Sequence, residues 1–199
     1  MRRQSVVLVD AGGTNIGSVR HALQRLGVDA QLTADAANIR AADKVIIPGV
    51  GAAGPGMARL QALGLVDIMR TLTQPVLGVC LGMQLLCTGS AEGDTSCLGV
   101  IPAPVLRMHG GPGERIPHMG WNRLQPTRPH PLLAGLEDGA QAYFVHGYAV
   151  PPGPYTLATS DHGGVFSAVV ARDNYFGMQF HPERSSVVGA RLLRNFLTL

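Results

Sequence analysis

The sequence predicts an α/β fold with an open, mostly parallel sheet, flanked by helices and extended by antiparallel strands in the second half. Through the first half, short apolar segments alternate with segments of helical periodicity, which is typical of a parallel sheet with helices on both faces. The largely apolar runs KVIIPG (44–49) and PVLGV (75–79) indicate strands buried on both faces. Beyond Thr88, glycine and proline become frequent and later segments pair like antiparallel strands.

The first half divides into strands and helices in order. Residues 5–10 predict the first strand, and residues 15–27 predict a helix because apolar side chains recur at helical spacing from Ile16 to Leu26. Residues 29–33 predict the second strand. Further helices are expected around residues 57–63, around residues 65–72 and directly after Cys80.

The second half predicts antiparallel strands and a closing helix. Residues 142–150 and 164–180 have the alternation of strands, and the tripeptide RDN at 172–174 predicts a hairpin turn inside the second segment. Residues 185–197 form an amphipathic pattern that predicts the last helix.

Composition limits the function classes. The 199 residues are 46% hydrophobic and 15% charged, which favours one globular domain over residues 1–199, and no apolar run is long enough to span a membrane. The net charge of +3 comes from scattered basic residues, so nucleic acid is not an expected partner. The start of the chain lacks signal-peptide features, and three cysteines without ligand spacing predict neither a disulfide framework nor a metal site. We expect a cytoplasmic protein.

The run GVCLG (78–82) places Cys80 between two glycines where a strand passes into a helix. A nucleophile that projects from a sharp strand-to-helix turn needs small neighbours, and the following helix directs its first amides at the sulfur. The backbone N–H of Leu81 would then face the oxygen of a tetrahedral intermediate. The alternative is that Cys80 is a small buried thiol in a tight turn.

A cysteine nucleophile needs a base, and the base needs a group that orients it. The run HPE places His181 after a strand and Glu183 two residues later, so that both side chains lie on one side of an extended segment. The alternatives are a structural histidine and a glutamate that favours the start of the last helix.

The glycine-rich run IIPGVGAAG (46–54) follows the third predicted strand. It lacks the lysine of a P-loop and the spacing of a dinucleotide-binding fingerprint. The amides of Val50 and Gly51 are candidates to complete an oxyanion hole, and the alternative is an ordinary loop with glycine at positive φ.

The motifs PGVG, GVCLGMQ and HPE, in this chain order, resemble the class I, triad-type glutamine amidotransferases. Within that group the chain is similar to the glutaminase subunits of imidazole glycerol phosphate synthases, because it has NIGSVRHAL (15–23), IPHMGWN (116–122) and YFVHGY (143–148). The resemblance covers nearly the whole chain. It implies an enzyme of histidine biosynthesis that needs neither a cofactor nor a metal.

The resemblance also implies a mechanism. Cys80 attacks the side-chain amide carbon of glutamine, His181 accepts the thiol proton and delivers one to the departing ammonia, and Glu183 holds the imidazole. Water then hydrolyses the glutamyl thioester. By similarity, the substrate is positioned by Gln84 and by backbone at Gly49, Gly51, His146, Gly147 and Tyr148.

The family passes ammonia to a (β/α)8-barrel synthase subunit in a heterodimer. By resemblance, the residues that lie toward this partner or its coupling path are Asn15, His118, Met119, Gly120, Trp121, Asn122 and Arg184. The chain departs from the family where lysines are usual and Arg115 and Arg184 stand, which keeps the charge and changes the donor geometry. Gly147 likewise replaces a small hydroxyl residue.

Three other functions compete with this interpretation. An amidotransferase subunit for another acceptor, such as that of anthranilate synthase, would share the triad and lack HMGWN. A non-catalytic amidotransferase-like binding module would lose a triad member, whereas all three are present. A cysteine hydrolase or stress-response protein would share the Cys80 turn and lack the PGVG and HPE pair.

Overall fold

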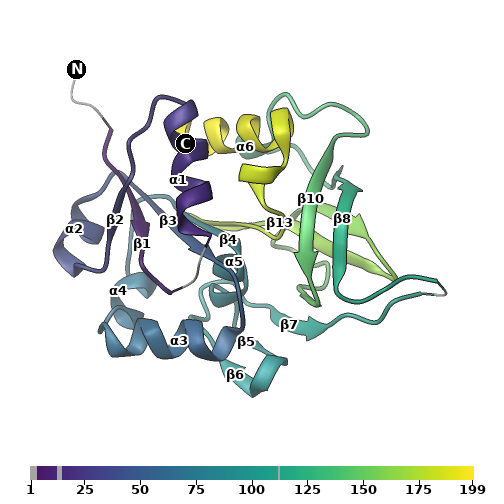
Figure 1. Cartoon of the computed structure of the whole chain (residues 1–199), viewed down its shortest axis with the longest axis horizontal. Coiled ribbons are helices and arrows are strands. Elements are labelled where there is room, and N and C mark those ends of the chain that lie inside the picture. The colour runs from purple at the N-terminus through teal and green to yellow at the C-terminus, as the bar shows by residue number, and fades with distance from the viewer. Residues whose placement is uncertain (1–3, 13–14, 112) are drawn as a thin grey trace.

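The computed structural model of the chain describes residues 4–12, 15–111 and 113–199, and a central sheet runs through it (Figure 1). The sheet has the strand order β2-β1-β3-β4-β14-β13-β12-β9. The strands are β1 (Val6–Val9), β2 (Gln31–Thr33), β3 (Lys44–Gly49), β4 (Val76–Cys80), β9 (Gln125–Pro126), β12 (Thr156–Asp161), β13 (Val165–Arg172) and β14 (Tyr175–Met178). Pairing is parallel from β2 to β14 and antiparallel from β14 to β9. This order confirms the predicted parallel half and its antiparallel extension.

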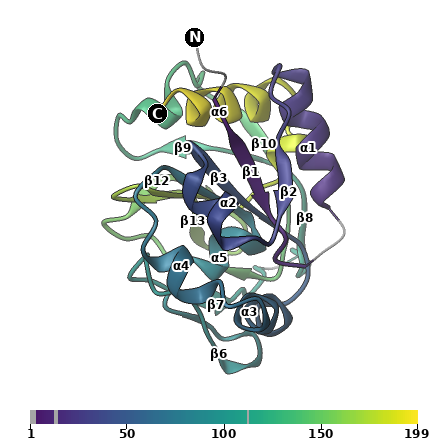
Figure 2. The same cartoon turned by 90° about the vertical axis from the view of Figure 1, so that its left-hand side faces the viewer.

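Helices cover both faces of the parallel half. The helices are α1 (Ile16–Arg25), α2 (Ala36–Ala41), α3 (Ala53–Ala62), α4 (Val66–Arg70), α5 (Leu81–Leu85) and α6 (Ser186–Thr198). Figures 1 and 2 show α1 and α6 together on one side of the sheet and α3 and α4 on the other. In β1, Val6 and Leu8 pack into the cluster that contains α1 and α6, while Val7 and Val9 pack into the opposite cluster. A strand between two apolar layers has no polar face, which explains its unbroken apolar sequence.

Two smaller strand groups stand beside the central sheet. A two-stranded antiparallel ribbon joins β8 (His118–Arg123) to β10 (Gln141–His146), and it lies at the right of Figure 1. A four-stranded group has the order β11-β7-β5-β6. Its strands are β5 (Gly89–Ser90), β6 (Thr95–Ser96), β7 (Pro104–Arg107) and β11 (Tyr148–Ala149). Three short 3-10 helices complete the described elements: η1 (Glu92–Asp94), η2 (Pro131–Leu133) and η3 (Pro182–Arg184).

The predicted elements and the observed ones differ in detail. The helix α2 was not predicted, although Asp35 caps it by accepting a hydrogen bond of 2.8 Å from the amide of Asn38. The helix that follows Cys80 is present but extends for only five residues. The predicted hairpin is confirmed: β13 and β14 pair across a turn in which Asp173 has a φ of 53°. No helix in the described ranges is long and apolar enough to cross a membrane.

Candidate active site

The strand-to-helix turn at Cys80 is strained and depends on two glycines. Cys80 has φ 53° and ψ −109°, a conformation that non-glycine residues rarely adopt. A Cβ at Gly78 would lie 2.5 Å from the backbone of Gly82, and a Cβ at Gly82 would lie 1.8 Å from the carbonyl oxygen of Ile47. Both glycines are therefore required by space, as the sequence pattern predicted.

The sheet order brings the three predicted motifs to one edge. Gly49 at the end of β3 pairs directly with Cys80 at the end of β4, and β14, on the other side of β4, leads to His181. Because parallel strands present their carboxyl ends at the same edge, the loops that follow them meet. Together with Glu92 of η1 and the segment from β10 to β11, they form a pocket of about 160 Å³, lined by Val50, Gly51, Cys80, Leu81, Gln84, Glu92, Val145, His146, Gly147, Tyr148 and His181.

His181 is held between Glu183 and Cys80. The Nδ1 atom of His181 lies 2.9 Å from Oε1 of Glu183, and their side chains are 5% and 1% exposed. Burial lowers the pKa of His181, but hydrogen bonds with Cys80 and Glu183 and the charges of both groups outweigh it and raise the pKa to about 10. The arrangement stabilises a charged imidazolium beside the sulfur, as nucleophilic catalysis by a cysteine requires.

Asn15 lies on this triad rather than on an exposed surface. Its side-chain nitrogen donates a hydrogen bond to Oε1 of Glu183 and lies 3.3 Å from Nδ1 of His181. The sequence interpretation placed Asn15 toward a partner. The structure adds a direct contact with the glutamate, and this contact joins residues 168 positions apart in the chain.

A hydrogen-bonded pair of glutamines extends from the lining of the pocket, at Gln84, into the core, at Gln179. Gln84 is buried and donates from Nε2 to the carbonyl of Tyr148 at 3.1 Å and to Oε1 of Gln179 at 3.0 Å. Gln179 in turn places its own Nε2 3.8 Å from the sulfur of Cys80. Gln84 is therefore not a solvated helix residue, and Gln179 is a buried neighbour of Cys80 that the sequence interpretation missed.

Glu92 is a second residue that the sequence interpretation missed. Among the described residues that line the pocket, Glu92 carries the carboxylate, and its Oε2 accepts a hydrogen bond of 3.1 Å from the amide of Ala53. It belongs to η1, between β5 and β6, and no motif in the sequence surrounds it. An acidic side chain in a pocket of this size is suited to bind an amino group.

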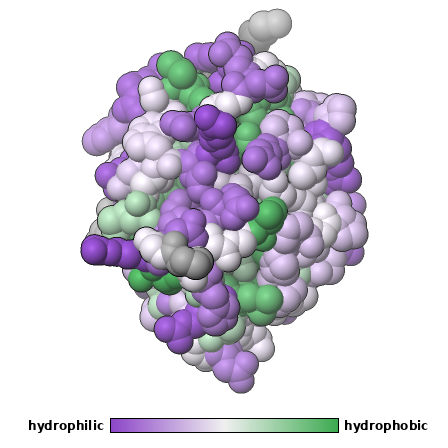
Figure 3. Space-filling view, turned by 90° about the vertical axis from the view of Figure 1, so that its right-hand side faces the viewer, coloured by the Kyte–Doolittle hydropathy of each residue, from purple (hydrophilic) through white to green (hydrophobic). Residues whose placement is uncertain are grey.

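An exposed aromatic and apolar face lies on the ribbon next to the triad. Met119 and Trp121 are 63% and 51% exposed. The guanidinium of Arg184 lies 4.2 Å from the ring centroid of Tyr143, and this ring is 5.9 Å from that of Trp121. Figure 3 views the molecule from the side of the ribbon, where separate hydrophobic areas stand within a mostly hydrophilic surface. Exposed residues of these types are typical of contact surfaces.

Three other residues predicted to lie toward a partner belong to the same strand, β8. His118 is buried and Asn122 is partly buried, so these two side chains face away from the exposed Met119 and Trp121. Gly120 has a φ of 144°, which only glycine adopts without strain. The strand therefore has one outward face and one face toward the pocket.

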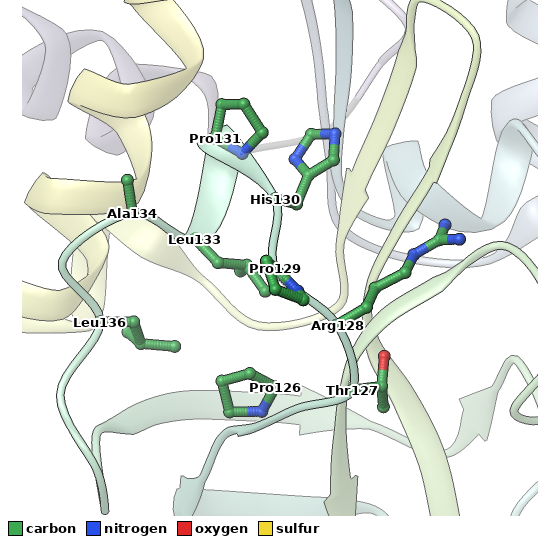
Figure 4. A pocket seen from close by; sticks show the side chains of 9 residues that line it. All are labelled: Pro126, Thr127, Arg128, Pro129, His130, Pro131, Leu133, Ala134 and Leu136. Atoms are coloured by element: carbon green, nitrogen blue, oxygen red, sulfur yellow. The ribbon is translucent and has the colours of Figure 1, made fainter.

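A cavity larger than this pocket lies elsewhere, and Figure 4 shows it. Its volume is about 740 Å³, and it is lined mainly by prolines and leucines of residues 126–136, with Arg128 and His130. None of the described residues that line it is a cysteine or an acid, so its chemistry does not compete with that of the pocket at Cys80.

The other two cysteines are unsuited to nucleophilic chemistry. Burial raises the pKa of Cys87 to about 12 and the pKa of Cys97 to about 11. Both thiols therefore stay protonated near neutral pH. Within the part of the chain that the structure describes, no group of three or more histidine, cysteine, aspartate or glutamate side chains is placed to hold a metal ion.

Known proteins resemble this chain along its length. The family described as Glutamine amidotransferase class-I matches residues 7–199. The chain is 58% identical over 194 residues to the imidazole glycerol phosphate synthase subunit HisH of Xanthomonas axonopodis pv. citri (strain 306), covering 98% of this chain and 97% of the relative. It is 55% identical over 194 residues to the subunit HisH of Xylella fastidiosa (strain Temecula1), with the same coverage.

A solved glutamine amidotransferase structure has the same fold, with a TM-score of 0.76, 23% identity and coverage of 98% of each chain. The predicted fold and the predicted family are thus both confirmed. The chain belongs to the class I glutamine amidotransferases and, within them, to the HisH subunits of imidazole glycerol phosphate synthase.

Proposed function

We propose that this chain is the glutaminase subunit of an imidazole glycerol phosphate synthase and that Cys80, His181 and Glu183 are its catalytic residues. The observation that carries the proposal is the strained turn that holds Cys80 in a pocket against His181, whose imidazole is held in turn by Glu183. Nucleophile, base and orienting group are together, and each has a buried or strained position that packing alone does not require.

In the first half of the reaction, the thiol proton of Cys80 passes to His181, and the sulfur then attacks the side-chain carbonyl carbon of glutamine. The C–S bond forms, and the electron pair of the carbonyl moves onto oxygen. When the tetrahedral intermediate collapses, the C–N bond breaks and His181 returns the proton to the leaving nitrogen, which departs as ammonia. A glutamyl thioester remains on Cys80.

In the second half, water replaces ammonia. His181 takes a proton from the water as its oxygen attacks the thioester carbon, the C–S bond breaks, and glutamate leaves while the sulfur regains a proton. Glu183 keeps Nδ1 of His181 protonated, so that the other ring nitrogen handles both transfers.

We assign the oxyanion hole to the amides of Val50, Gly51 and Leu81, which all line the pocket with Cys80. Backbone at Gly49, His146, Gly147 and Tyr148, together with Gln84, positions the substrate. Glu92 supplies the carboxylate that binds the α-ammonium group of glutamine, since a free amino acid carries this charge and the pocket has an acid to match it.

The ammonia acceptor is a (β/α)8-barrel synthase subunit that docks on the β8–β10 ribbon. Free ammonia would be protonated in bulk water and lose its nucleophilicity, so release next to a bound partner preserves it. Support comes from the exposed Met119, Trp121 and Arg184 near the triad. In this proposal, Asn15, His118, Gly120 and Asn122 also lie toward the partner or along its coupling path.

The test is glutamate release from glutamine by the purified chain, first alone and then with the barrel subunit and its nucleotide ligand. The proposal expects release that rises steeply with the partner, and transfer of 15N from the amide of labelled glutamine into imidazole glycerol phosphate. If glutamate is released only with another synthase, such as anthranilate synthase, the proposed ammonia acceptor is wrong. Binding of the partner without any release would instead favour the non-catalytic module.

Glu92→Gln is expected to raise the KM for glutamine by about 10-fold to 100-fold and to change kcat little, because a charge-assisted hydrogen bond to the ammonium group is lost. Steady-state kinetics of glutamate release measure both parameters. Glu137→Gln, the same change at an exposed position, serves as the control. An unchanged KM in Glu92→Gln would remove Glu92 from substrate binding.

Glu183→Gln is expected to lower kcat by about 10³-fold to 10⁴-fold, the range that loss of an orienting carboxylate costs in a triad. The pKa of His181 should also fall from about 10, because a hydrogen-bond acceptor and a negative charge are removed. NMR titration of His181 and steady-state kinetics test the two effects. Near-normal kcat in this variant would contradict the assigned role.

Glu183→Gln should also change how the free energy of unfolding depends on pH. A histidine whose pKa is raised on folding stabilises the protein fully below the unfolded pKa of 6.5, and loses that contribution as pH rises through about 10. The difference in unfolding free energy between the native chain and Glu183→Gln should therefore be largest below pH 6.5 and should close as pH approaches 10. Urea unfolding at a series of pH values measures it.

A further inference from the structure

Three histidines gather behind the pocket, and the proposed reaction uses none of their side chains. In the β8–β10 ribbon, His118 pairs directly with His146, so both side chains lie on the same face. The ring of His162 stacks on that of His118 with centroids 4.1 Å apart, and the ring of Phe144 stacks on His118 at 5.0 Å. Phe166 lies edge-on to His146 at 4.9 Å. The cluster is thus packed on several sides.

A hydrogen bond to the main chain fixes the proton on His146. Its Nδ1 lies 2.8 Å from the carbonyl oxygen of Tyr148. A carbonyl only accepts, so Nδ1 of His146 carries the hydrogen and, in the neutral ring, Nε2 is an acceptor. Nδ1 of His118 lies 3.1 Å from this Nε2 and must therefore be the donor.

The hydrogen bonds of Asn122, at the other end of this line of side chains, give the same donor-to-acceptor direction independently. Asn122 donates from Nδ2 to the carbonyl of Asp161 at 2.7 Å, and its Oδ1 accepts from the amide of Arg123 at 2.8 Å. The orientation of the Asn122 amide is therefore set by the backbone. Its Nδ2, which can only donate, also lies 3.4 Å from Nε2 of His118, so Nε2 accepts and Nδ1 of His118 is the protonated atom. Each hydrogen bond from Asn122 through His118 and His146 to Tyr148 therefore has its donor on the Asn122 side.

The lowered pKa values of His118 and His146 agree with this direction of hydrogen bonding. Burial lowers the pKa of His146 to about 3 against its hydrogen bond to Tyr148, with further lowering by the neighbouring His118, His162 and His181. Burial and His162 lower the pKa of His118 to about 4 against an opposing effect of Glu114. Both rings are therefore neutral at physiological pH, as two facing histidines in a hydrogen-bonded chain must be.

This line of hydrogen bonds ends at the carbonyl oxygen of Tyr148, a residue that lines the pocket. The carbonyl of Tyr148 that accepts from His146 also accepts from Nε2 of Gln84, whose amide nitrogen in turn contacts Gln179 beside Cys80. Tyr148, His146 and Gln84 all line the pocket. The position of this wall thus depends on a line of hydrogen bonds that begins on β8, the strand whose other face exposes Met119 and Trp121.

We propose that His118 and His146 are positioning residues for glutamine: their fixed, neutral tautomers hold the carbonyl of Tyr148 and, through it, Gln84 in the geometry that binds substrate. The proposal rests on the proposed glutaminase function and deepens it. It assigns to the imidazole of His118 a role inside the subunit, in addition to any contact of β8 with a partner.

Kinetics of the full chain with the barrel subunit test the role. His118→Phe keeps a stacking ring and leaves Nε2 of His146 without a donor, and we expect the KM for glutamine to rise about 10-fold to 100-fold. In His118→Asn, the side-chain nitrogen replaces Nδ1 as donor, and the KM should return to within about 3-fold of the native value. His130→Asn, in the remote cavity of Figure 4, is the matched control, because asparagine also accepts the hydrogen bond that His130 accepts from Leu132.

Two results would overturn the positioning role. One is a native KM in His118→Phe, and the other is an equal loss in His118→Phe and His118→Asn, which would indicate packing rather than hydrogen bonding. If the native chain releases no glutamate with any partner, the proposed function fails and the positioning role fails with it. Turnover with an unchanged KM in His118→Phe removes the positioning role alone.

NMR of the chain with 15N-labelled histidine gives a readout that needs no substrate. The nitrogen shifts should report the Nδ1–H tautomer for both His118 and His146, without titration from pH 5.5 to pH 8.5. Titration of either ring in this range, or an Nε2–H tautomer in His146, would contradict the chain of hydrogen bonds itself.

Discussion

Cys80→Ala is expected to lower kcat for glutamine hydrolysis by about 10⁶-fold, the scale at which loss of a covalent nucleophile is felt in a hydrolase. Without the sulfur no thioester forms, and the remaining pocket offers only binding and the oxyanion amides. The fold should survive, because alanine at position 80 removes one buried atom and retains the backbone. Glutamate release over long incubation measures the residual rate.

Cys97→Ala is the matched control for this variant. Cys97 is also buried, but it lies outside the pocket and burial raises its pKa to about 11. Its replacement should leave kcat within about 2-fold of the native value, since the thiol takes no part in the reaction. Comparable losses in both variants would mean that the effect is structural and that Cys80 is not the nucleophile.

Gly82→Ala is expected to have the largest effect on stability, with a loss of about 3–5 kcal/mol in the free energy of unfolding. The added Cβ would stand 1.8 Å from the carbonyl oxygen of Ile47, a contact that real Cβ atoms do not make. The Cβ is fixed to the backbone of α5 and meets a backbone oxygen of β3, so no side-chain rotation relieves the clash. The melting temperature should fall by about 6–20 °C in a chain of this size.

Gly17→Ala provides the comparison, because it adds the same methyl group to a helix where space is open. Apart from its chain neighbours and the backbone of its own helix, no atom of the described residues lies within 4 Å of a Cβ at Gly17, which is exposed on α1. Alanine favours helix over glycine by about 1 kcal/mol, so the melting temperature should stay equal or rise. Native stability in Gly82→Ala would show that α5 does not pack on β3 as described.

Much of the fold followed from the sequence because both faces of the parallel strands are buried. Runs such as KVIIPG and PVLGV have no polar face to expose, and this property predicts helices on both sides of the sheet. The helix α2 was not predicted, because its six residues bury only Ile39 and show little periodicity. The pairing of β8 with β10 joins segments that no local pattern connects.

The residues of the candidate site likewise fall into those that a local pattern predicts and those that only tertiary packing brings together. Cys80 belongs to a local motif that the geometry of the turn requires, and His181 and Glu183 are neighbours in sequence, so a short pattern predicts each part. Glu92 reaches the pocket, and Gln179 reaches Cys80, only through tertiary packing of η1 and of the segment that follows β14. Their residue types are common and their surroundings carry no motif, so nothing in the sequence distinguishes them from ordinary surface or core residues.

The contact between Asn15 and Glu183 is a further case. The resemblance to a known family indicated that Asn15 is functional, but only the fold brings it from the start of α1 to the triad. The histidine chain from Asn122 to Tyr148 likewise needs the register of the ribbon, because a shift of one residue would turn His118 to the outer face.

The central claim is that a glutamyl thioester forms on Cys80, and trapping this intermediate tests it most directly. The chain and its barrel partner would be mixed with carbon-labelled glutamine, quenched in acid within the first turnover, digested and analysed by mass spectrometry. We expect label on the peptide that contains Cys80 and no label on the peptides that contain Cys87 or Cys97. Glutamate formed without labelled Cys80, or with label on another cysteine, would contradict the account.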